Sequence, residues 1–233
     1  MNLAVLQARM SSSRLPGKVL APVLGEPMIG RQIERLRRAS RIDVLVVATS
    51  LDPSDDPLAA YCGTLGVPVH RGSLHDVLDR FCGVLRTYPS TNALIRLTAD
   101  CPLADWSVVD GVIERHIGEG ADYTNNTMPE RTFPHGLDVE AIRPGALFEA
   151  EREAADPYER EHVTPFIYRR PERYRLASLS RSPSLGALRW TVDLPADLAF
   201  VRDVYGELYP GDPAFDSLAI ERLDRNTAEC GDG

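Results

Sequence analysis

The stretch LAVLQARMSSSRLPGK, residues 3–18, decides the fold class and indicates a kind of ligand. Its first four residues form a short apolar run, which is typical of a buried strand. The rest is a loop of small residues with two arginines and one lysine. Small residues let backbone N–H groups approach phosphate oxygens, and the cations supply charge-assisted hydrogen bonds to them. We therefore predict a nucleoside triphosphate site just after the first strand. The residues assigned to it are Ala8, Arg9, Ser13, Arg14 and Lys18.

The loop matches neither of the two common phosphate-binding motifs. Both G-x-x-x-x-G-K-[ST] and G-x-G-x-x-G need at least two glycines, whereas the loop contains only Gly17. A solvated basic loop is the alternative interpretation. We favour phosphate binding because the three cations lie among small residues and Pro16-Gly17 fixes the turn. The sequence therefore predicts a third kind of nucleotide site, neither a Walker loop nor a dinucleotide fingerprint.

The first half of the chain alternates between two hydrophobic patterns. Four apolar runs suit buried parallel strands, and the segments between them have apolar residues at three- and four-residue spacing, as in helices. This alternation predicts βαβ units, whose right-handed crossovers place helices on both faces of one sheet. The expected fold class is α/β, a three-layer α/β/α Rossmann-like fold with a mostly parallel sheet. Strands are expected at 3–6, 44–48, 67–69 and 93–97, and helices at 28–39, 57–65, 74–86 and 107–117.

The second half has a weaker and mixed pattern. We expect a single domain over 1–233, with a nucleotide-binding half at 1–125 and a polar tail at 226–233 that frays. Between them, 126–225 contains a small mixed α+β insertion that covers the site and forms an acceptor-binding and dimerisation half. Extended segments are expected at 137–142, 174–179 and 189–193, and helices at 144–155, 156–168 and 195–205.

The balance of charges excludes several classes of partner. The 233 residues carry a formal net charge of −8 and a pI near 5.2, so we expect no general affinity for nucleic acid or an anionic membrane. No apolar run reaches the roughly 18 residues of a membrane helix, and no secretory leader pattern is visible. We expect a cytoplasmic protein. Four scattered cysteines without a C-x-x-C pair predict reduced thiols rather than disulfides or a metal cluster.

Two aspartates lie where strands are expected to end. Asp100 follows the apolar run at 93–97, and Asp193 follows the segment 189–192. In open α/β sheets the ligand lies outside the carboxyl ends of the strands, where Arg9 also falls. Two carboxylates that face a triphosphate can hold Mg²⁺, which prefers oxygen ligands. For Asp193, as for Asp105, a helix N-cap is the alternative.

Six segments, in this order, resemble the cytidylyltransferases that activate acidic sugars, the group that includes CMP-Kdo and CMP-sialic acid synthetases. The closer resemblance is to the branch usually labelled spore-coat polysaccharide biosynthesis protein F, and it covers nearly the whole chain. The segments are ARMSSSRLPGKVL (8–20), HRGSLHDVLDRF (70–81), RLTADCPL (96–103), PHGLDVE (134–140), YEREHVTP (158–165) and RWTVDLP (189–195).

The resemblance implies a nucleotidyltransferase fold and a specific reaction. CMP would pass from CTP to the hydroxyl of an acidic sugar or sugar-like acceptor, with release of pyrophosphate, in the biosynthesis of a surface polysaccharide or glycoconjugate. Similar synthetases hold Mg²⁺ with aspartates at the positions of Asp100 and Asp193, and they are commonly homodimers. The catalytic residues would be Arg9, Arg14, Lys18 and Asp100.

Further along the chain, the resemblance assigns Ser73 and the following helix start to cytosine or ribose, and Arg80 to the nucleotide. The residues alone leave this open, because Asp76 and Arg80 are also spaced for an ordinary ion pair on a helix surface.

A loop and a helix in the second half are candidates for the acceptor. Arg131 and His135 are suited to a carboxylate and hydroxyls, and the alternation in 137–141 leaves two acids on the face opposite the strand core. Around His162, a charged and solvated helix face is the alternative to an acceptor or dimer role. The residues assigned to the acceptor are Arg131, His135, Asp138, Glu140 and His162.

Two other classes of function remain. A metal-dependent glycosyltransferase shares the layered fold, but such enzymes typically position the metal with a D-x-D triplet, which this chain lacks. A catalytically impaired nucleotide-binding protein is the second alternative. It is motivated by Ser11 and Ala99, where the family pattern has glycine at the first position and often at the second.

Overall fold

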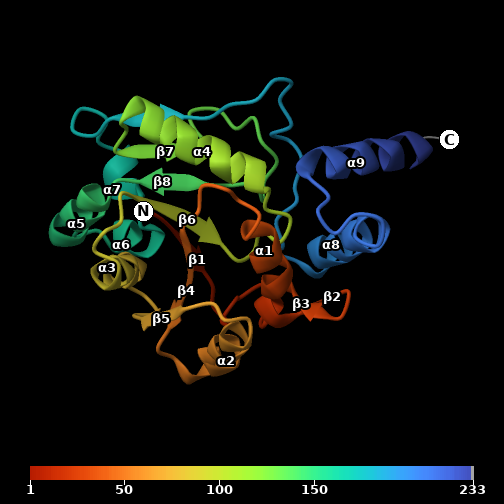
Figure 1. The fold of residues 1–233 in the computed structure, drawn as a ribbon, viewed down its shortest axis with the longest axis horizontal. Helices are drawn as coiled ribbons and strands as arrows, with labels where there is room; N and C mark the ends of the chain where they lie inside the picture. Colours follow the sequence, from red (N-terminus) through yellow and green to blue (C-terminus); the bar gives the residue numbers. More distant parts are fainter. Residues whose placement is uncertain (232–233) are drawn as a thin grey trace.

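The computed structural model describes residues 1–231 and is built on a seven-stranded mixed sheet (Figure 1). The strand order is β5-β4-β1-β6-β8-β7-β9. The first four strands in this order run parallel, β8 is antiparallel to both β6 and β7, and β9 is parallel to β7. The strands are β1 (Asn2–Gln7), β4 (Val44–Ser50), β5 (Val69–Gly72), β6 (Ala93–Thr98), β7 (Tyr123–Asn125), β8 (Glu140–Ile142) and β9 (Leu176–Ser178).

Helices cover both faces of this sheet. Along β1, Leu3 and Val5 belong to one buried cluster, whereas Ala4 and Leu6 belong to the other. Alternate side chains of a strand point to opposite faces, so β1 is packed on both sides. The Ala4 side is covered by α1 (Met28–Leu36), α2 (Asp56–Thr64), α4 (Trp106–Glu119) and α8 (Pro195–Leu208), and the Leu3 side by α3 (Val77–Thr87), α5 (Pro144–Glu153) and α7 (Pro165–Tyr168).

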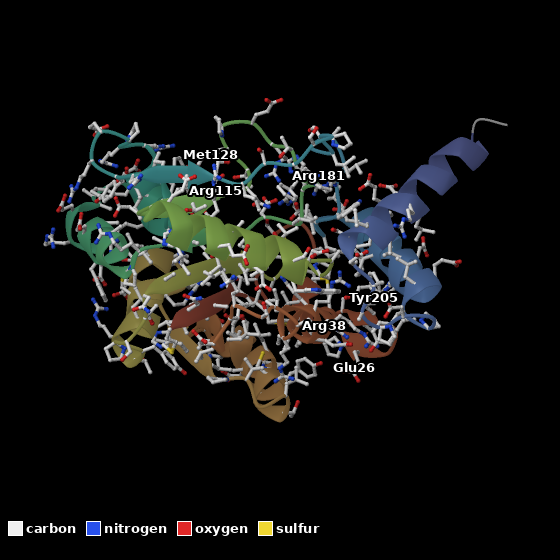
Figure 2. All side chains as sticks on the ribbon, turned by 45° about the horizontal axis from the view of Figure 1, so that its top comes forward. Glu26, Arg38, Arg115, Met128, Arg181 and Tyr205 are labelled. Atoms are coloured by element: carbon white, nitrogen blue, oxygen red, sulfur yellow. The ribbon has the colours of Figure 1, made fainter. Side chains whose placement is uncertain are left out.

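The remaining elements are short or lie at the edge of the layers. The hairpin β2 (Pro22–Val23) and β3 (Glu26–Pro27) contacts α8, and α9 (Ser217–Gly231) packs beside α8 at the same end of the molecule (Figure 1). Figure 2 shows the side chains of this end, where Tyr205 of α8 and Arg38 lie in the same region of the view. The last elements are η1 (Lys18–Leu20), η2 (Pro53–Asp55) and α6 (Pro157–His162).

The predicted three-layer α/β fold is confirmed. All four predicted strands of the first half are present, although β5 begins two residues later than expected, and a helix follows each of the four as predicted. None of the helices within residues 1–231 combines the length and apolar character of a membrane span. The thiols of Cys62, Cys82 and Cys101 are free and buried. The prediction for Cys230 lies outside the described side chains.

Four predictions for the second half need correction. The helix expected at 156–168 is divided into α6 and α7, because Val163 takes a φ of 72° that an α-helix cannot continue through. The segment 189–193 is not a strand, since only a single bridge joins His135 to Arg189. The strand at 137–142 is shortened to β8. Helix α9 continues into the expected tail as far as Gly231, and residues 232–233 lie outside the described part.

Candidate active site

The loop that follows β1 is held by its own backbone and by a buried carboxylate. Met10 donates its N–H to Asp55 Oδ1 at 2.7 Å, and Gly17 donates to the carbonyl of Met10 at 2.9 Å. Burial raises the pKa of Asp55, but hydrogen bonds from Met10 and Ser50 outweigh it and hold the pKa below its ordinary value. Gly17 has a φ of 72°, which glycine adopts without strain. The turn thereby directs Lys18 toward the sheet.

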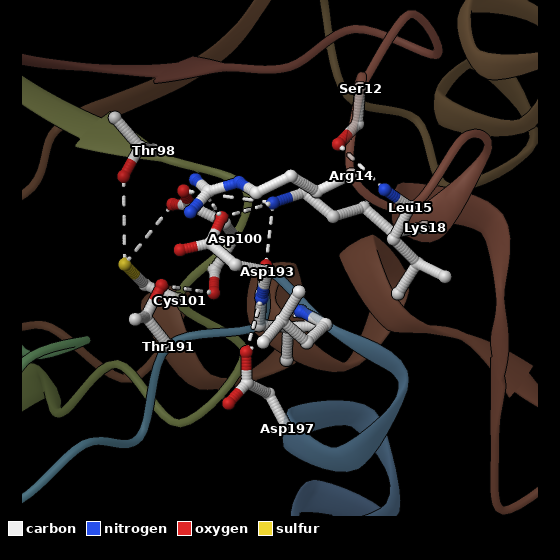
Figure 3. A network of polar contacts seen from close by, with 12 residues as sticks. Ser12, Arg14, Leu15, Lys18, Thr98, Asp100, Cys101, Thr191, Asp193 and Asp197 are labelled. Carbon is white, nitrogen blue, oxygen red and sulfur yellow. Dashed lines mark hydrogen bonds and ion pairs between the residues drawn. The ribbon is translucent and has the colours of Figure 1, made fainter.

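Lys18 is buried between two carboxylates that come from distant parts of the chain. Its Nζ lies 3.2 Å from Asp193 Oδ1 and 3.8 Å from Asp100 Oδ2, and it donates a hydrogen bond of 2.5 Å to the carbonyl of Val192 (Figure 3). Only 8 % of Lys18 is exposed. A buried ammonium requires such partners, because removing a charge from water is costly. The predicted convergence of the loop and both aspartates is therefore present.

Three cations surround the carboxylate of Asp193. Arg14 lies 2.7 Å from its Oδ1 and Arg189 lies 2.7 Å from its Oδ2, in addition to Lys18. Burial raises the pKa of Asp193, but these three cations outweigh it and lower the pKa below its usual value. The alternative of an N-cap is excluded for Asp193, because the N-cap of α8 is Leu194.

Asp100 is attached to the segment that carries Asp193. Its carbonyl accepts a hydrogen bond of 2.7 Å from Val192 N and one of 3.1 Å from Thr191 Oγ1. The Cys101 thiol donates to Asp100 Oδ1 at 3.3 Å. A third of the Asp100 side chain is exposed, and its Oδ2 lies 3.8 Å from Lys18 Nζ. Asp105, by contrast, is the N-cap of α4.

These residues surround a cleft of about 210 Å³ at the carboxyl ends of β1 and β6. Arg9 has no hydrogen-bond or ion-pair partner among residues 1–231, so its guanidinium is available to a ligand. The cleft is lined by Gln7, Ala8, Arg9, Ser12, Ser13, Arg14, Lys18, Val19, Thr98, Ala99, Asp100 and Asp193.

A second pocket of about 250 Å³ adjoins the cleft through Thr98, which lines both. Three tyrosine rings and several hydroxyl groups make it suited to a polyhydroxylated molecule. It is lined by Arg96, Thr98, Tyr123, Thr127, Met128, Asp138, Glu140, Tyr158, His162, Thr164, Pro165 and Tyr168.

Glu140 is the centre of a hydrogen-bond network in the wall of the second pocket. Its Oε1 accepts hydrogen bonds from Tyr123 Oη at 2.6 Å and from Thr164 Oγ1 at 2.7 Å, and its Oε2 pairs with Arg96. Burial lowers the pKa of Arg96, but Glu140 outweighs it and raises the pKa. Glu140 therefore fixes the wall and has little capacity left for a ligand.

A family model described as cytidylyltransferase matches residues 3–197. The chain belongs to the cytidylyltransferase family. Membership confirms the predicted class of enzyme, a nucleotidyltransferase.

Three relatives show how far the similarity extends. The spore coat polysaccharide biosynthesis protein SpsF of Bacillus subtilis is 34 % identical over 231 residues, which cover 96 % of this chain and 94 % of the relative. A cytidylyltransferase structure from Leptospira borgpetersenii is 27 % identical with a TM-score of 0.91, covering 97 % of this chain and 95 % of that one. The structure of a CMP:2-keto-3-deoxy-manno-octonic acid synthetase complexed with CTP is 19 % identical with a TM-score of 0.67, over 88 % and 98 %. That likeness shows the fold alone.

The cytidylyltransferase places five of the predicted nucleotide residues in the cleft and leaves two outside its lining. Ser73 accepts a hydrogen bond from Asp76 N at 2.9 Å, and its carbonyl accepts one of 2.8 Å from Arg80. The alternative prediction, a surface ion pair between Asp76 and Arg80, is wrong. Arg80 is only 1 % exposed, and Asp76 pairs with Arg160 instead. Burial, and Arg9 nearby, lower the pKa of Arg80 to about 10.

The predicted acceptor residues are divided in the same way. Asp138, Glu140 and His162 line the second pocket, whereas Arg131 and His135 do not. Arg131 forms a bidentate pair with Asp138 at 2.5 and 2.9 Å. It therefore affects the pocket through the charge of Asp138 and not by lining it. The pKa of His135 is lowered by burial and by Arg131.

Sequence reasoning missed several residues that form the site. Asp55, Arg96 and Thr98 carry no motif of their own, although Arg96 and Thr98 lie inside a quoted segment and alternate on the strand before Asp100. Arg189 was quoted for the resemblance but given no role. Tyr158 has no predicted role, yet its ring lies against His162 with centroids 4.2 Å apart and lines the second pocket with it.

The donor set of the cleft fits a divalent cation. Asp100 Oδ2 and Asp193 Oδ1 both approach one point, which the ammonium of Lys18 marks. Within residues 1–231 no group of three or more acidic, histidine or cysteine side chains is arranged to hold a metal by itself. The protein therefore offers two hard carboxylate oxygens, and other ligands must come from phosphate and water, as is usual for Mg²⁺.

Proposed function

We propose that this cytidylyltransferase transfers CMP from CTP to a hydroxyl of an acidic sugar or sugar-like acceptor and releases pyrophosphate. The observation that carries the proposal is the position of Lys18 Nζ, 3.8 Å from Asp100 and 3.2 Å from Asp193, in a cleft with Arg9 and Arg14 on its wall. The printed names of two similar proteins, one in spore coat polysaccharide biosynthesis and one complexed with CTP, support the acceptor class and the nucleotide.

The reaction requires positioning and charge compensation more than covalent chemistry. The acceptor oxygen attacks the α-phosphorus while the bond to the leaving pyrophosphate breaks. Negative charge then grows on the pyrophosphate, and Arg9, Arg14 and Lys18 are placed to compensate it. The backbone at Ala8 and Ser13 can approach the phosphates closely because both side chains are small.

Asp100 and Asp193 are the residues that would hold Mg²⁺. Bound there, the ion would neutralise phosphate charge and lower the pKa of the attacking hydroxyl. Lys18 and Arg14, which contact these carboxylates, would then pair with the triphosphate. The negative charges of Asp100 and Asp193 would thus be balanced either by Lys18 and Arg14 or by the ion.

We assign the acceptor to the second pocket, because Thr98 forms the wall between this pocket and the cleft. Asp138 and His162 are exposed to its interior and would contact hydroxyls of the acceptor. Glu140 would hold Tyr123 and Thr164 in the pocket wall through its hydrogen bonds and would not contact the acceptor itself. Arg131, paired with Asp138, and His135 lie outside the pocket lining and would set the charge of the pocket for an acidic acceptor.

Ser73 and Arg80 remain part of the proposed nucleotide site. Arg80 is buried, yet its Nε and one terminal nitrogen have no hydrogen-bond partner in the described part of the chain. Unpaired buried donors are rare in proteins and are commonly completed by a ligand or water. We therefore propose that the nucleotide approaches Arg80 beyond Arg9. A cytoplasmic homodimer completes the proposal and rests on the resemblance to synthetases that are commonly dimeric.

The reaction is tested by pyrophosphate release from CTP in the presence of a panel of ulosonic acids, amino-sugar acids and phosphonates. The wild type should release pyrophosphate with at least one acceptor and support isotope exchange between pyrophosphate and CTP, with UTP as the competing nucleotide. Asp100→Ala should abolish both while the protein remains folded, because the side chain is partly exposed and the carbonyl of Asp100, not its carboxylate, holds the neighbouring segment.

Asp203→Ala is the matched control, because Asp203 is an exposed aspartate on α8 outside the cleft lining. It should leave turnover unchanged. Unchanged turnover in Asp100→Ala would remove the metal assignment. Transfer of a sugar from a nucleotide sugar without pyrophosphate exchange would instead show a glycosyltransferase.

A further inference from the structure

The two oxygens of the Asp193 carboxylate have different kinds of partner. Oδ1 is bound by Arg14 at 2.7 Å and by Lys18 at 3.2 Å, and both belong to the loop that lines the cleft. Oδ2 is bound by Arg189 at 2.7 Å. Arg189 precedes Asp193 by four residues and does not line the cleft. One oxygen of the carboxylate therefore contacts side chains that line the cleft, and the other contacts a side chain outside the cleft lining.

Arg189 is held in place independently of the cleft. Its guanidinium also lies 3.4 Å from Asp197 on the first turn of α8. Asp197 Oδ2 in turn accepts the backbone N–H groups of Asp193 and Leu194, both at 2.8 Å. Arg189, Asp193 and Asp197 thus form a closed set of contacts in which Asp197 fixes the backbone and Arg189 fixes the carboxylate.

The backbone on either side of this set is attached to the rest of the molecule. Trp190 N donates to the carbonyl of His135 at 2.7 Å, and Val192 N donates to the carbonyl of Asp100 at 2.7 Å. Trp190 is 1 % exposed. The segment has no strand partners to hold it over its length, so these bonds and the Arg189 contacts determine where Asp193 points.

We propose that Arg189 is a positioning residue that keeps Asp193 Oδ2 occupied, so that Oδ1 alone is offered to a divalent cation in the cleft. The proposal rests on the proposed function, in which Asp193 holds Mg²⁺ together with CTP. When Arg14 and Lys18 turn to the triphosphate, Arg189 remains on Oδ2. Without it, the carboxylate is free to rotate and loses its fixed orientation toward Asp100.

The test measures binding of Mn²⁺, as a spectroscopic substitute for Mg²⁺, by electron paramagnetic resonance in the presence of CTP and without an acceptor. Arg189→Gln should weaken Mn²⁺ binding about tenfold, the lower end of the effect of removing a group that orients a metal ligand. Its affinity for CTP without metal should stay within about twofold of wild type, because Arg189 lies outside the cleft lining. Arg189→Lys retains a charge near Oδ2 and should restore a large part of the loss.

Arg41→Gln is the matched control. Arg41 pairs with Glu114 on the surface, and its side chain is 45 % exposed, close to the 43 % of Arg189. The control should bind Mn²⁺ and CTP like wild type. A general effect of losing a surface arginine would appear in both variants.

The outcomes separate the two proposals. If wild type binds Mn²⁺ tightly with CTP and Arg189→Gln does so equally, the role of Arg189 is overturned and the proposed function stands. If wild type binds no Mn²⁺ with CTP, both are overturned. Should Arg189→Gln fail to fold, Arg189→Lys and Asp197→Asn decide. Asn still accepts the two N–H groups but loses the charge that anchors Arg189, so a wild-type Mn²⁺ affinity in Asp197→Asn would contradict the proposal, whatever the affinity of Arg189→Lys.

Discussion

Arg14 and Asp193 form an ion pair of 2.7 Å that joins the first loop of the chain to the segment before α8. The two side chains differ in exposure, 61 % for Arg14 and 11 % for Asp193. The arginine is therefore the partner that can leave. Arg14 and Lys18 both contact Asp193 Oδ1, the oxygen that the proposed metal site needs.

We predict that divalent cations bind weakly until CTP draws Arg14 and Lys18 away from Asp193. Arg14→Ala should strengthen Mn²⁺ binding in the absence of CTP by about fivefold, because it removes a screened ion pair of roughly 1 kcal/mol that competes for Asp193. Isothermal titration with Mn²⁺, with and without CTP, measures both effects. Equal Mn²⁺ affinity of the wild type with and without CTP would contradict the prediction.

A second prediction concerns the wall of the acceptor pocket. Glu140→Ala removes the acceptor of two hydroxyl hydrogen bonds and the partner of Arg96. Breaking a fully buried pair by removing one member costs about 3–5 kcal/mol, and this pair is 16 % and 14 % exposed, so the free energy of unfolding should fall by up to that amount. Glu140→Gln keeps an oxygen for Tyr123 or Thr164 and should lose roughly half as much. Denaturation in urea measures both. A loss below about 1 kcal/mol in Glu140→Ala would show that the network contributes little.

A third prediction separates the acceptor from the nucleotide. His162 is exposed, lines the second pocket and lies next to Tyr158, but it does not line the nucleotide cleft. His162→Ala should raise the KM for the acceptor about tenfold, equivalent to roughly 1.4 kcal/mol of lost binding, and leave the KM for CTP unchanged. Steady-state kinetics with each substrate varied in turn measures this. A parallel rise in both KM values would move the acceptor out of the second pocket.

The sequence predicts the first half of the site for a clear physical reason. Parallel strands end at one edge of the sheet, and Gln7 of β1 is in register with Thr98 of β6, so residues that follow them must meet. Arg9 and Asp100 were therefore placed correctly from strand ends alone. No such rule governs Asp193, because its segment is not a strand and is positioned by hydrogen bonds to Asp100 and His135. The strand end predicted for Asp193 is absent, and only the resemblance favours the metal role of Asp193 over an N-cap.

Helical periodicity was also insufficient for two side chains. Arg80 has the spacing of a surface ion pair with Asp76, but in the structure it is buried and bonded to the carbonyl of Ser73. His116 lies on α4 in a pattern that indicates a surface residue, yet it is 5 % exposed. A long polar side chain can turn inward wherever a carbonyl or hydroxyl is available, and a single sequence does not show which partner the fold will bring.

The burial of His116 leads to a prediction on pH. Its Nδ1 lies 3.0 Å from Thr124 Oγ1, and burial lowers its pKa from the ordinary 6.5. A histidine whose pKa is lowered by folding binds protons more readily in the unfolded chain, so acid favours unfolding. Stability should be fully present above pH 6.5 and should decline as the pH falls toward the lowered folded-state pKa. Aspartates whose pKa values are lowered stay ionised in this range, so they do not contribute to the decline.

Thermal unfolding between pH 7.5 and 5.5 measures the effect. The melting temperature of the wild type should decrease with acidification, and His116→Gln should show a flatter dependence because it has lost one of the titrating groups. Some slope should remain, since burial also lowers the pKa of His70 and His135. His75→Gln is the control, because His75 is exposed and its removal should leave the slope unchanged. Identical slopes in wild type and His116→Gln would show that His116 accepts its proton in the folded protein as readily as in the unfolded chain.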